Sequence, residues 1–213
     1  MGWTSNFGNP KGFLGKIFLL CMNIGHTGIS SWAMSKYNWG YETKALDIGC
    51  GGGINMKRMI NLTTNGKIIG IDISEECLKK SKKMNSKTHP SIWSAEYGCA
   101  EDIPLGSDYF DIVTAFETIY FWNDIPKAFS EVMRVLKPGG VFMAVNAASD
   151  PNAIWGKMIE GMKIRTPEEL TECMSEIGFT DIITYRKHKS WYCILAKKPS
   201  GKNKFHAFGA PIV

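Results

Sequence analysis

A run of glycines directly after a short apolar stretch constrains the fold of this chain more than any other feature. Residues 45–48 have the composition of a buried strand, and four of the five residues at 49–53 are glycine. Glycine tolerates positive φ and has no Cβ, so such a backbone bends sharply and lets a ligand come close. A helical pattern containing Met56 and Met59 follows. This order predicts a ligand site at a helix N-terminus, at the carboxyl edge of a parallel sheet.

Strand and helix patterns alternate along the rest of the chain, which is the order expected of an α/β domain. Apolar or β-branched stretches predict parallel strands at residues 45–48, 67–73, 92–97, 110–116 and 141–146. Residues 179–186 and 191–197 form two further strand patterns around a short polar turn, so we expect them to pair antiparallel. The predicted fold is Rossmann-like, with a seven-stranded, mostly parallel sheet and an antiparallel C-terminal hairpin strand.

Capping residues mark where helices begin and end between these strands. Ser74 precedes two glutamates and is suited to cap a helix N-terminus. Thr166 is followed three residues later by Glu169, which predicts a capping box for a helix that ends at Gly178. Another helical pattern is stopped by the Lys-Pro-Gly-Gly sequence at residues 137–140.

Length and composition fit one globular domain with terminal extensions. The chain has 213 residues, of which 44% are hydrophobic and 21% charged. We expect residues 1–41 to form a helical cap, residues 42–198 the ligand-binding domain and residues 199–213 a loose tail. The apolar run at residues 17–22 is far shorter than the roughly 20 residues that span a membrane. It predicts a short amphipathic helix and no membrane span.

Charge and cysteine usage argue against two other classes of site. The net charge is +5, and the basic residues are scattered rather than gathered on a stripe with aromatics, so we expect no nucleic-acid partner. The six cysteines form no C-x-x-C pair, and no histidine lies at zinc-ligand spacing. We therefore expect no metal and a reducing, cytoplasmic location. The sequence carries no signal for an oligomeric state.

The residues around the glycine loop indicate which nucleotide ligand it binds. A dinucleotide fingerprint needs a small sixth residue, and counting from the first or second loop glycine that residue is Ile54 or Met56. Asp47, before the loop, would repel a pyrophosphate but attract the ammonium of a zwitterionic ligand. Asp72 ends the second strand, where an acidic residue takes ribose hydroxyls in nucleotide-binding folds. These features favour S-adenosylmethionine over a nicotinamide dinucleotide.

The order of these motifs resembles that of the class I S-adenosylmethionine-dependent methyltransferases. Within that class the chain is similar to the type 11 group, which is related to the ubiquinone and menaquinone C-methylating enzymes. The matching segments are residues 45–55, 70–74, 100–105, 110–116 and 135–140. The resemblance implies the fold of that family, S-adenosylmethionine as the cofactor and S-adenosylhomocysteine as the product.

The resemblance also implies which residues hold the cofactor. Asp72 would hold the ribose hydroxyls and Ile73 would lie against the adenine, while Cys99 departs from the polar residue often found beside that ring. A backbone amide is therefore expected to serve the adenine at this position. The full set is Asp47, Gly49, Cys50 and Gly51 near the methionine portion, Phe116 and Glu117 beside the transferred methyl, Asp72 and Ile73, and Cys99, Ala100 and Glu101 around the adenine.

Methyl transfer from a sulfonium is an in-line displacement and requires no covalent residue. Aligning the nucleophile with the leaving sulfur supplies a large part of the barrier reduction, about 7–11 kcal/mol. His26, before the first strand, is a candidate general base, with helix capping as the alternative. Tyr120 is the second catalytic candidate. The polar tips of Tyr120 and Trp122 favour a place in the acceptor pocket, and Phe121 is expected in the core.

Missing motifs favour a small organic acceptor. The chain has no Asn/Asp-Pro-Pro-Tyr/Phe run, which the amino-methylating DNA, RNA and glutamine enzymes carry, and no Pro-Cys nucleophile for cytosine C5. Three alternatives stay open: a nicotinamide-dependent oxidoreductase, a non-catalytic S-adenosylmethionine-binding protein, and methylation of a macromolecule. The sequence does not indicate whether O, N, C or S receives the methyl group.

Overall fold

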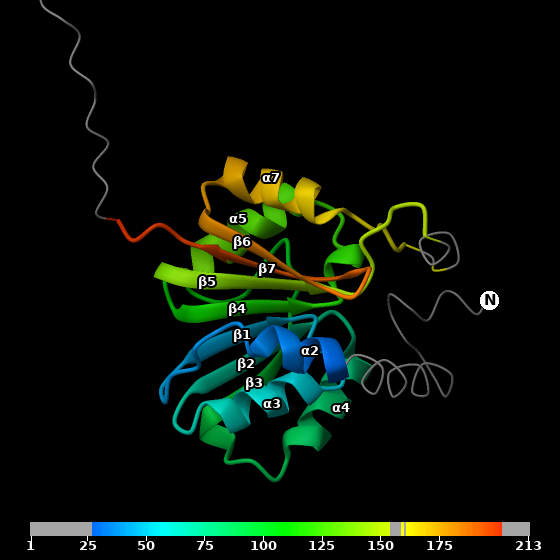
Figure 1. Cartoon of the computed structure of the whole chain (residues 1–213). Helices are drawn as coiled ribbons and strands as arrows, with labels where there is room; N and C mark the ends of the chain where they lie inside the picture. The colour runs from blue at the N-terminus through cyan, green and yellow to red at the C-terminus, as the bar shows by residue number, and fades with distance from the viewer. Residues whose placement is uncertain (1–26, 154–158, 160, 202–213) are drawn as a thin grey trace, which may run out of the picture.

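The computed structural model describes residues 27–153, 159 and 161–201, which form a seven-stranded sheet flanked by helices (Figure 1). The predicted helix at residues 17–22 and most of the predicted cap lie outside the described residues. Among the described residues, no helix has the length and apolarity needed to cross a membrane. The elements are α2 (Thr27–Met34), β1 (Lys44–Ile48), α3 (Ile54–Leu62), β2 (Lys67–Asp72), α4 (Glu75–Asn85), η2 (Pro90–Ile92), β3 (Trp93–Tyr97), β4 (Phe110–Phe116), η3 (Ile119–Phe121), α5 (Ile125–Val135), β5 (Leu136–Asn146), α7 (Pro167–Ile177), β6 (Thr180–Lys187) and β7 (Trp191–Lys197).

The strands lie in the order β3-β2-β1-β4-β5-β7-β6. Strands β1 to β5 pair in parallel, whereas β7 runs antiparallel to both β5 and β6. The predicted mostly parallel sheet with an antiparallel hairpin strand is confirmed. The strand order reverses between β1 and β4, and ligands of open α/β sheets bind outside the carboxyl ends at such a switch point.

Alternating side chains of the central strands enter two separate cores, one on each face of the sheet. On β5, Phe142 and Ala144 belong to the core covered by α5 and α7. Met143 and Val145, on the same strand, belong to the core under α2, α3 and α4. All four side chains are fully buried. Because both faces are covered, the strands are apolar along most of their length, and polar groups gather at their ends.

The helix ends follow the predicted capping residues. The hydroxyl of Ser74 accepts a hydrogen bond from the amide of Cys77 at the start of α4. Thr166 and Glu169 form the predicted capping box before α7, and Gly178 ends that helix with a φ of 102°. Each cap satisfies backbone groups that a helix end leaves without partners.

One boundary differs from the prediction. Helix α5 ends at Val135 and β5 begins at Leu136, although the sequence pattern placed the start of this strand at residue 141. The strand starts earlier because residues before and within the glycine pair also form strand contacts. Leu136 pairs with Phe110, and the amide of Gly139 donates to the carbonyl of Lys198 at 2.9 Å. The Lys-Pro-Gly-Gly sequence thus ends the helix as predicted, but it continues as strand.

Candidate functional site

The loop between β1 and α3 bends through left-handed glycines. Gly49 has a φ of 70° and Gly51 a φ of 54°, values that side chains on L-residues rarely allow. A Cβ on Gly49 would collide with Cγ2 of Thr118, in the turn that follows β4. A Cβ on Gly51 would meet nothing nearer than 4.0 Å. The loop therefore packs tightly against the β4 turn at one glycine and faces open space at the next.

Asp72 ties this loop to the start of α4. Its Oδ2 accepts a hydrogen bond from the amide of Gly51 at 2.9 Å, and its Oδ1 accepts one from the amide of Ser74 at 2.8 Å. Burial raises the pKa of the Asp72 carboxyl, and the amides of Ser74 and Gly51 partly offset that rise. A carboxylate has about four lone-pair sites. After these two bonds, acceptor capacity remains for the hydroxyls of a ribose.

Asp47 lies deeper than the loop that follows it. Its side chain is 1% exposed, and its Oδ1 accepts a hydrogen bond from Oγ1 of Thr114 at 2.8 Å. Burial raises the pKa of Asp47 to about 7; the Thr114 hydroxyl lowers it, and the charge of Asp72 raises it. The predicted attraction for an ammonium group stays a prediction, and it needs Asp47 in its ionised form.

The turn after β4 packs beside the glycine loop. Phe116 and Glu117 are both 6% exposed, and the amide of Glu117 donates to the carbonyl of Val145 at 2.8 Å. Glu117 has a φ of 61°, which is strained for any residue other than glycine. Burial raises the pKa of its carboxyl to about 8, against a lowering effect of the Ala147 amide. Thr118 donates to the carbonyl of Ile48 at 3.2 Å, which fixes this turn against the end of β1.

The segment predicted to border an adenine ring is anchored to the start of α5. Oε1 of Glu101 accepts a hydrogen bond from the amide of Asn123 at 2.8 Å, and Cys99 forms an isolated bridge with Asp102. Ala100 is buried in the core. Ile73, which directly follows Asp72, is 48% exposed although it is a large apolar residue. An exposed apolar side chain at a strand end is available to cover a planar ring.

The catalytic candidates fall in different places. His26 lies outside the described residues. Tyr120 is 3% exposed, and its hydroxyl accepts a hydrogen bond from the amide of Ala148 at 2.8 Å. Burial, and then the charge of Glu117, raise the pKa of the Tyr120 phenol. Tyr120 thus lies in the turn after β4 at the carboxyl edge, with its hydroxyl held by the backbone of Ala148.

The prediction that Trp122 lines the acceptor pocket is wrong. Trp122 is 6% exposed and belongs to the core under α5 and α7. Its ring stacks on Phe142 with centroids 6.5 Å apart and meets Phe129 edge-on at 6.2 Å. Phe121, which was expected in the core, is the less buried neighbour. In the η3 turn Trp122 is therefore the core residue and Phe121 is not, the opposite of what we expected. A segment this short has no periodic pattern that could have shown which side chain is buried.

Several residues of this edge were missed because their sequence signal is weak. Thr114 and Thr118 are polar residues within and after an apolar strand, and both bind the end of β1. Asn146 ends β5, and its Nδ2 donates to the hydroxyl of Tyr192 on β7 at 2.6 Å. A polar residue at the carboxyl end of an apolar strand is the one signal that could have singled out Asn146.

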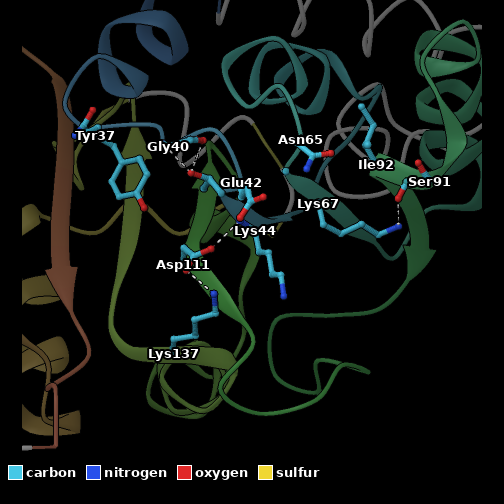
Figure 2. Close-up of a pocket in the computed structure, with 13 residues that line it drawn as sticks. Tyr37, Gly40, Glu42, Lys44, Asn65, Lys67, Ser91, Ile92, Asp111 and Lys137 are labelled. Atoms are coloured by element: carbon cyan, nitrogen blue, oxygen red, sulfur yellow. Dashed lines mark hydrogen bonds and ion pairs between the residues drawn. The ribbon is translucent and has the colours of Figure 1, made fainter.

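A hollow of about 770 Å³ lies at the opposite, amino edge of the sheet (Figure 2). Lys44, Asp111 and Lys137 line it, and Asp111 accepts from the amide of Lys44 at 2.8 Å and from Nζ of Lys137 at 2.6 Å. None of the predicted cofactor residues lines this hollow. The carboxyl edge remains the candidate site because the glycine bend and its carboxylates meet there.

Comparison with known proteins gives matches over the same core. Residues 46–144 match the family described as "Methyltransferase domain". The arginine-hydroxylase NDUFAF5, a mitochondrial protein of Rattus norvegicus, is 35% identical over 140 residues, which are 66% of this chain and 36% of that protein. A demethylmenaquinone methyltransferase of Symbiobacterium thermophilum is 33% identical over 105 residues, which are 48% of this chain and 42% of the other. The chain thus matches less than half the length of these two relatives.

A solved structure of similar fold comes from Haemonchus contortus. It is phosphoethanolamine N-methyltransferase 2 in complex with S-adenosyl-L-methionine, with a TM-score of 0.78. The match covers 93% of this chain and 60% of the other, at 15% sequence identity. At that identity the likeness concerns the fold alone.

Proposed function

We propose that this chain, whose residues 46–144 match the methyltransferase domain family, transfers a methyl group from S-adenosylmethionine to a small organic acceptor. The observation that carries the proposal is the bend at Gly49 and Gly51, held between the Asp72 carboxylate and the turn after β4. This bend gives a cofactor open backbone beside Gly51. It also brings the Asp72 carboxylate, the proposed acceptor for the ribose diol, into contact with that backbone.

The residues proposed to hold the cofactor divide the carboxyl edge into regions. Asp72 would bind the ribose hydroxyls, and the exposed Ile73 would cover the adenine, with the Cys99–Glu101 segment on the other side of the ring. The methionine portion would lie between the glycine loop and Glu117. These roles rest on the family resemblance and on the placement of the residues at one edge.

Methyl transfer needs alignment and exclusion of water more than a reactive side chain. The cofactor supplies an electrophilic methyl group on a sulfonium. The chain would hold this group at the switch point, where the hydroxyl of Thr118 donates to the carbonyl of Ile48 and links the β4 turn to the end of β1. Tyr120 and His26 stay proposed catalytic residues.

A relative with a small-molecule name supports a small acceptor. The name of that protein refers to demethylmenaquinone. A relative named as an arginine-hydroxylase leaves a protein-bound acceptor as the second candidate within this family. The nicotinamide alternative is disfavoured by Met56, which is fully buried where a dinucleotide fold needs a small residue.

The test is a calorimetric titration of the full chain with S-adenosylhomocysteine, S-adenosylmethionine and NAD. We expect heat for the first two and none for NAD. A chain that responds to NAD alone, or to none of the three, contradicts the proposal. Incubation with S-adenosylmethionine labelled at its methyl group and a cell extract would then separate an enzyme, which yields a labelled product, from a binding protein.

We also propose a reducing compartment such as the cytoplasm. Its support is that Cys50, Cys77, Cys99, Cys173 and Cys193 are all free thiols. Fractionation of cells that express a tagged chain would test this location, and recovery from an oxidising compartment would contradict it.

A further inference from the structure

Helix α4 lies beside α3 and is linked to the glycine loop at both of its ends (Figure 1). At the start of α4, the Asp72 carboxylate accepts hydrogen bonds from the amides of Gly51 and Ser74. At the end of α4, Nδ2 of Asn85 donates to the carbonyl of Gly53 at 3.3 Å. Neither partner of this second contact belongs to the residues proposed to bind the cofactor. The loop is thus held at two separate points by one helix.

The partners of Asn85 fix the direction of its carboxamide. Nδ2 also donates to the carbonyl of Ser81 at 3.0 Å. Both partners are carbonyl oxygens, which only accept, so the group that faces them must be the NH₂. The side chain is 1% exposed, and its Oδ1 is buried with no hydrogen-bond partner among the described residues. Because a buried oxygen without a donor is unfavourable, the favourable contribution of this side chain comes from its NH₂ group.

Gly53 lets the loop backbone lie directly against α4. It is the N-cap of α3, it has a φ of 82°, and it makes no side-chain cap. A Cβ on Gly53 would collide with Oγ of Ser81 and would lie 2.8 Å from both Cα of Ser81 and Nδ2 of Asn85. Ser81 and Asn85 are four residues apart, so they lie on the same face of α4. This face of the helix and the loop glycine therefore form one close contact.

The carbonyl of Gly53 receives two hydrogen bonds. The amide of Lys57 donates to it at 3.0 Å, as the first intrahelical bond of α3, and Nδ2 of Asn85 is the second donor. A carbonyl oxygen has two lone pairs, so both are in use. In a planar trans peptide the following N–H points opposite to the carbonyl. By holding the Gly53 carbonyl, Asn85 therefore also sets the direction of the Ile54 amide, the first amide of α3.

The direction of this amide bears on one half of the proposed cofactor. The amides of residues 54–56 precede the first intrahelical bond of α3, so they have no partner within the helix and suit a negatively charged group. The methionine portion of S-adenosylmethionine, proposed to lie beside the glycine loop, carries a carboxylate. The adenosine portion is proposed to lie at Asp72 and Ile73 instead. The contact of Asn85 with Gly53 is thus coupled to the amino-acid portion and not to the adenosine.

Building on the methyl transfer proposed above, we propose that Asn85 is a positioning residue for the amino-acid portion of S-adenosylmethionine. It acts through the Gly53 carbonyl, which it holds so that the first amides of α3 face the cofactor carboxylate. Asn85 itself does not touch the cofactor, because it is buried and its NH₂ binds only backbone. Loss of this NH₂ should leave the adenosine subsite in place, since Asp72 is bound separately by the Ser74 amide at the other end of α4.

The test compares two ligands of the full chain, S-adenosylhomocysteine and 5′-methylthioadenosine. The second has the same adenosine and sulfur but no amino-acid group, so the ratio of the two affinities reports on the amino-acid subsite. Calorimetry gives strong affinities, and displacement of labelled S-adenosylhomocysteine gives weak ones. Asn85→Leu keeps a similar size and removes the donor. We expect it to weaken S-adenosylhomocysteine by at least about fivefold and to leave 5′-methylthioadenosine within about twofold.

A matched control weakens the packing of the same helix without touching Gly53. Leu78 is 7% exposed and lies in the core between α4 and the sheet. Leu78→Ala should lower the melting temperature and leave the affinity ratio unchanged, because a larger unfolded fraction weakens both ligands equally. Asn85→Ala removes the NH₂ without adding atoms and should lower the ratio as Asn85→Leu does. It provides the measurement if the leucine variant does not fold.

The outcomes separate the two proposals. If the Asn85 variants keep the original affinity ratio, the positioning role is overturned while methyl transfer stands. A fall of the ratio in Leu78→Ala as large as in the Asn85 variants overturns it too, and so does failure of both Asn85 variants to fold, which would make Asn85 a residue of the fold alone. If S-adenosylhomocysteine does not bind the original chain, methyl transfer itself is contradicted and the role of Asn85 falls with it.

Discussion

The Asp72 carboxylate accepts a hydrogen bond from the backbone amide of Gly51 at 2.9 Å, and so joins the end of β2 to the bend after β1. The same side chain caps the approach to α4 through the amide of Ser74 at 2.8 Å. One residue thus shapes the loop and offers its remaining lone pairs to a ligand. This dual role makes both stability and cofactor affinity depend on Asp72.

Replacing Asp72 by Asn should weaken cofactor binding and the fold together. One oxygen becomes an NH₂ group that faces an amide donor, so one hydrogen bond is lost and one amide is left without its acceptor. We expect the free energy of unfolding to fall by about 1–3 kcal/mol and the dissociation constant of S-adenosylhomocysteine to rise at least tenfold. Chemical denaturation and calorimetry measure the two effects. Glu75→Gln, an exposed neighbour on α4, is the control and should change neither quantity appreciably.

Replacing Gly49 by Ala should lower the free energy of unfolding by more than the cost of the left-handed backbone alone. The left-handed conformation alone costs roughly 1–2 kcal/mol for an L-residue, and the new Cβ would also collide with Cγ2 of Thr118. Gly161→Ala isolates the first cost, because Gly161 has a φ of 78° and open space around it. We expect Gly49→Ala to destabilise the chain by about 1–3 kcal/mol more than Gly161→Ala, in line with overpacked cores.

The double variant Gly49→Ala with Thr118→Ser identifies the source of that difference. Serine keeps the hydroxyl that donates to Ile48 and removes the methyl group in the way. Denaturation curves should show that the pair is more stable than the sum of the single changes predicts. Strict additivity would mean that the Thr118 methyl group is not what excludes a side chain from position 49.

The stability of the fold should fall as pH rises through the neutral range. Burial raises the pKa of Asp47 to about 7 and that of Glu117 to about 8, whereas unfolded carboxyls titrate near 4. Between these values the native state binds more protons than the unfolded state, so the stabilisation present at low pH is lost as pH rises. Between pH 5 and pH 8 we expect a loss on the order of a few kcal/mol.

Asp47→Asn tests the assignment of this slope. An amide does not titrate, and its oxygen can still accept from Thr114. Unfolding free energies measured at several values from pH 5 to pH 8 should therefore vary less with pH in this variant than in the original chain. Equal slopes in the two proteins would show that Asp47 is ionised throughout this range in the folded state.

Trp122 should matter for stability and not for the cofactor. Its ring fills the core between Phe129 and Phe142, and Trp122→Ala should cost about 3–5 kcal/mol. Trp122→Phe keeps an aromatic ring and should cost considerably less. Affinity for S-adenosylhomocysteine, measured on the phenylalanine variant, should stay within twofold. A large loss of affinity with unchanged stability would show that Trp122 lines the ligand pocket.

Local patterns predicted the frame of the site well. Alternation of strands and helices indicated the parallel sheet, and capping residues such as Ser74 and Thr166 marked helix ends correctly, because caps satisfy backbone groups within a few residues. The bend at Gly49 and Gly51 was also visible, since left-handed backbone is a local requirement that glycine meets. The cofactor roles of these residues stay predictions, which the titrations above test.

Contacts between side chains on neighbouring strands could not be predicted from local patterns. Asn146 and Tyr192 are 46 positions apart, and they meet because β7 pairs antiparallel with β5. The side-chain contact of Asp47 with Thr114 likewise requires β1 to lie beside β4. Such contacts depend on strand order and register.

The sequence by itself determined that a glycine bend follows the first strand and that an acidic residue ends the second, because each depends on neighbouring residues and the alternating pattern. Only the tertiary structure decided what those groups touch. Burial of Trp122 in a core, and of Glu117 and Asn146 at one edge, follows from how seven strands assemble. The reason is physical: hydrogen bonds and pKa shifts depend on distance and burial in space, which separation along the chain does not specify.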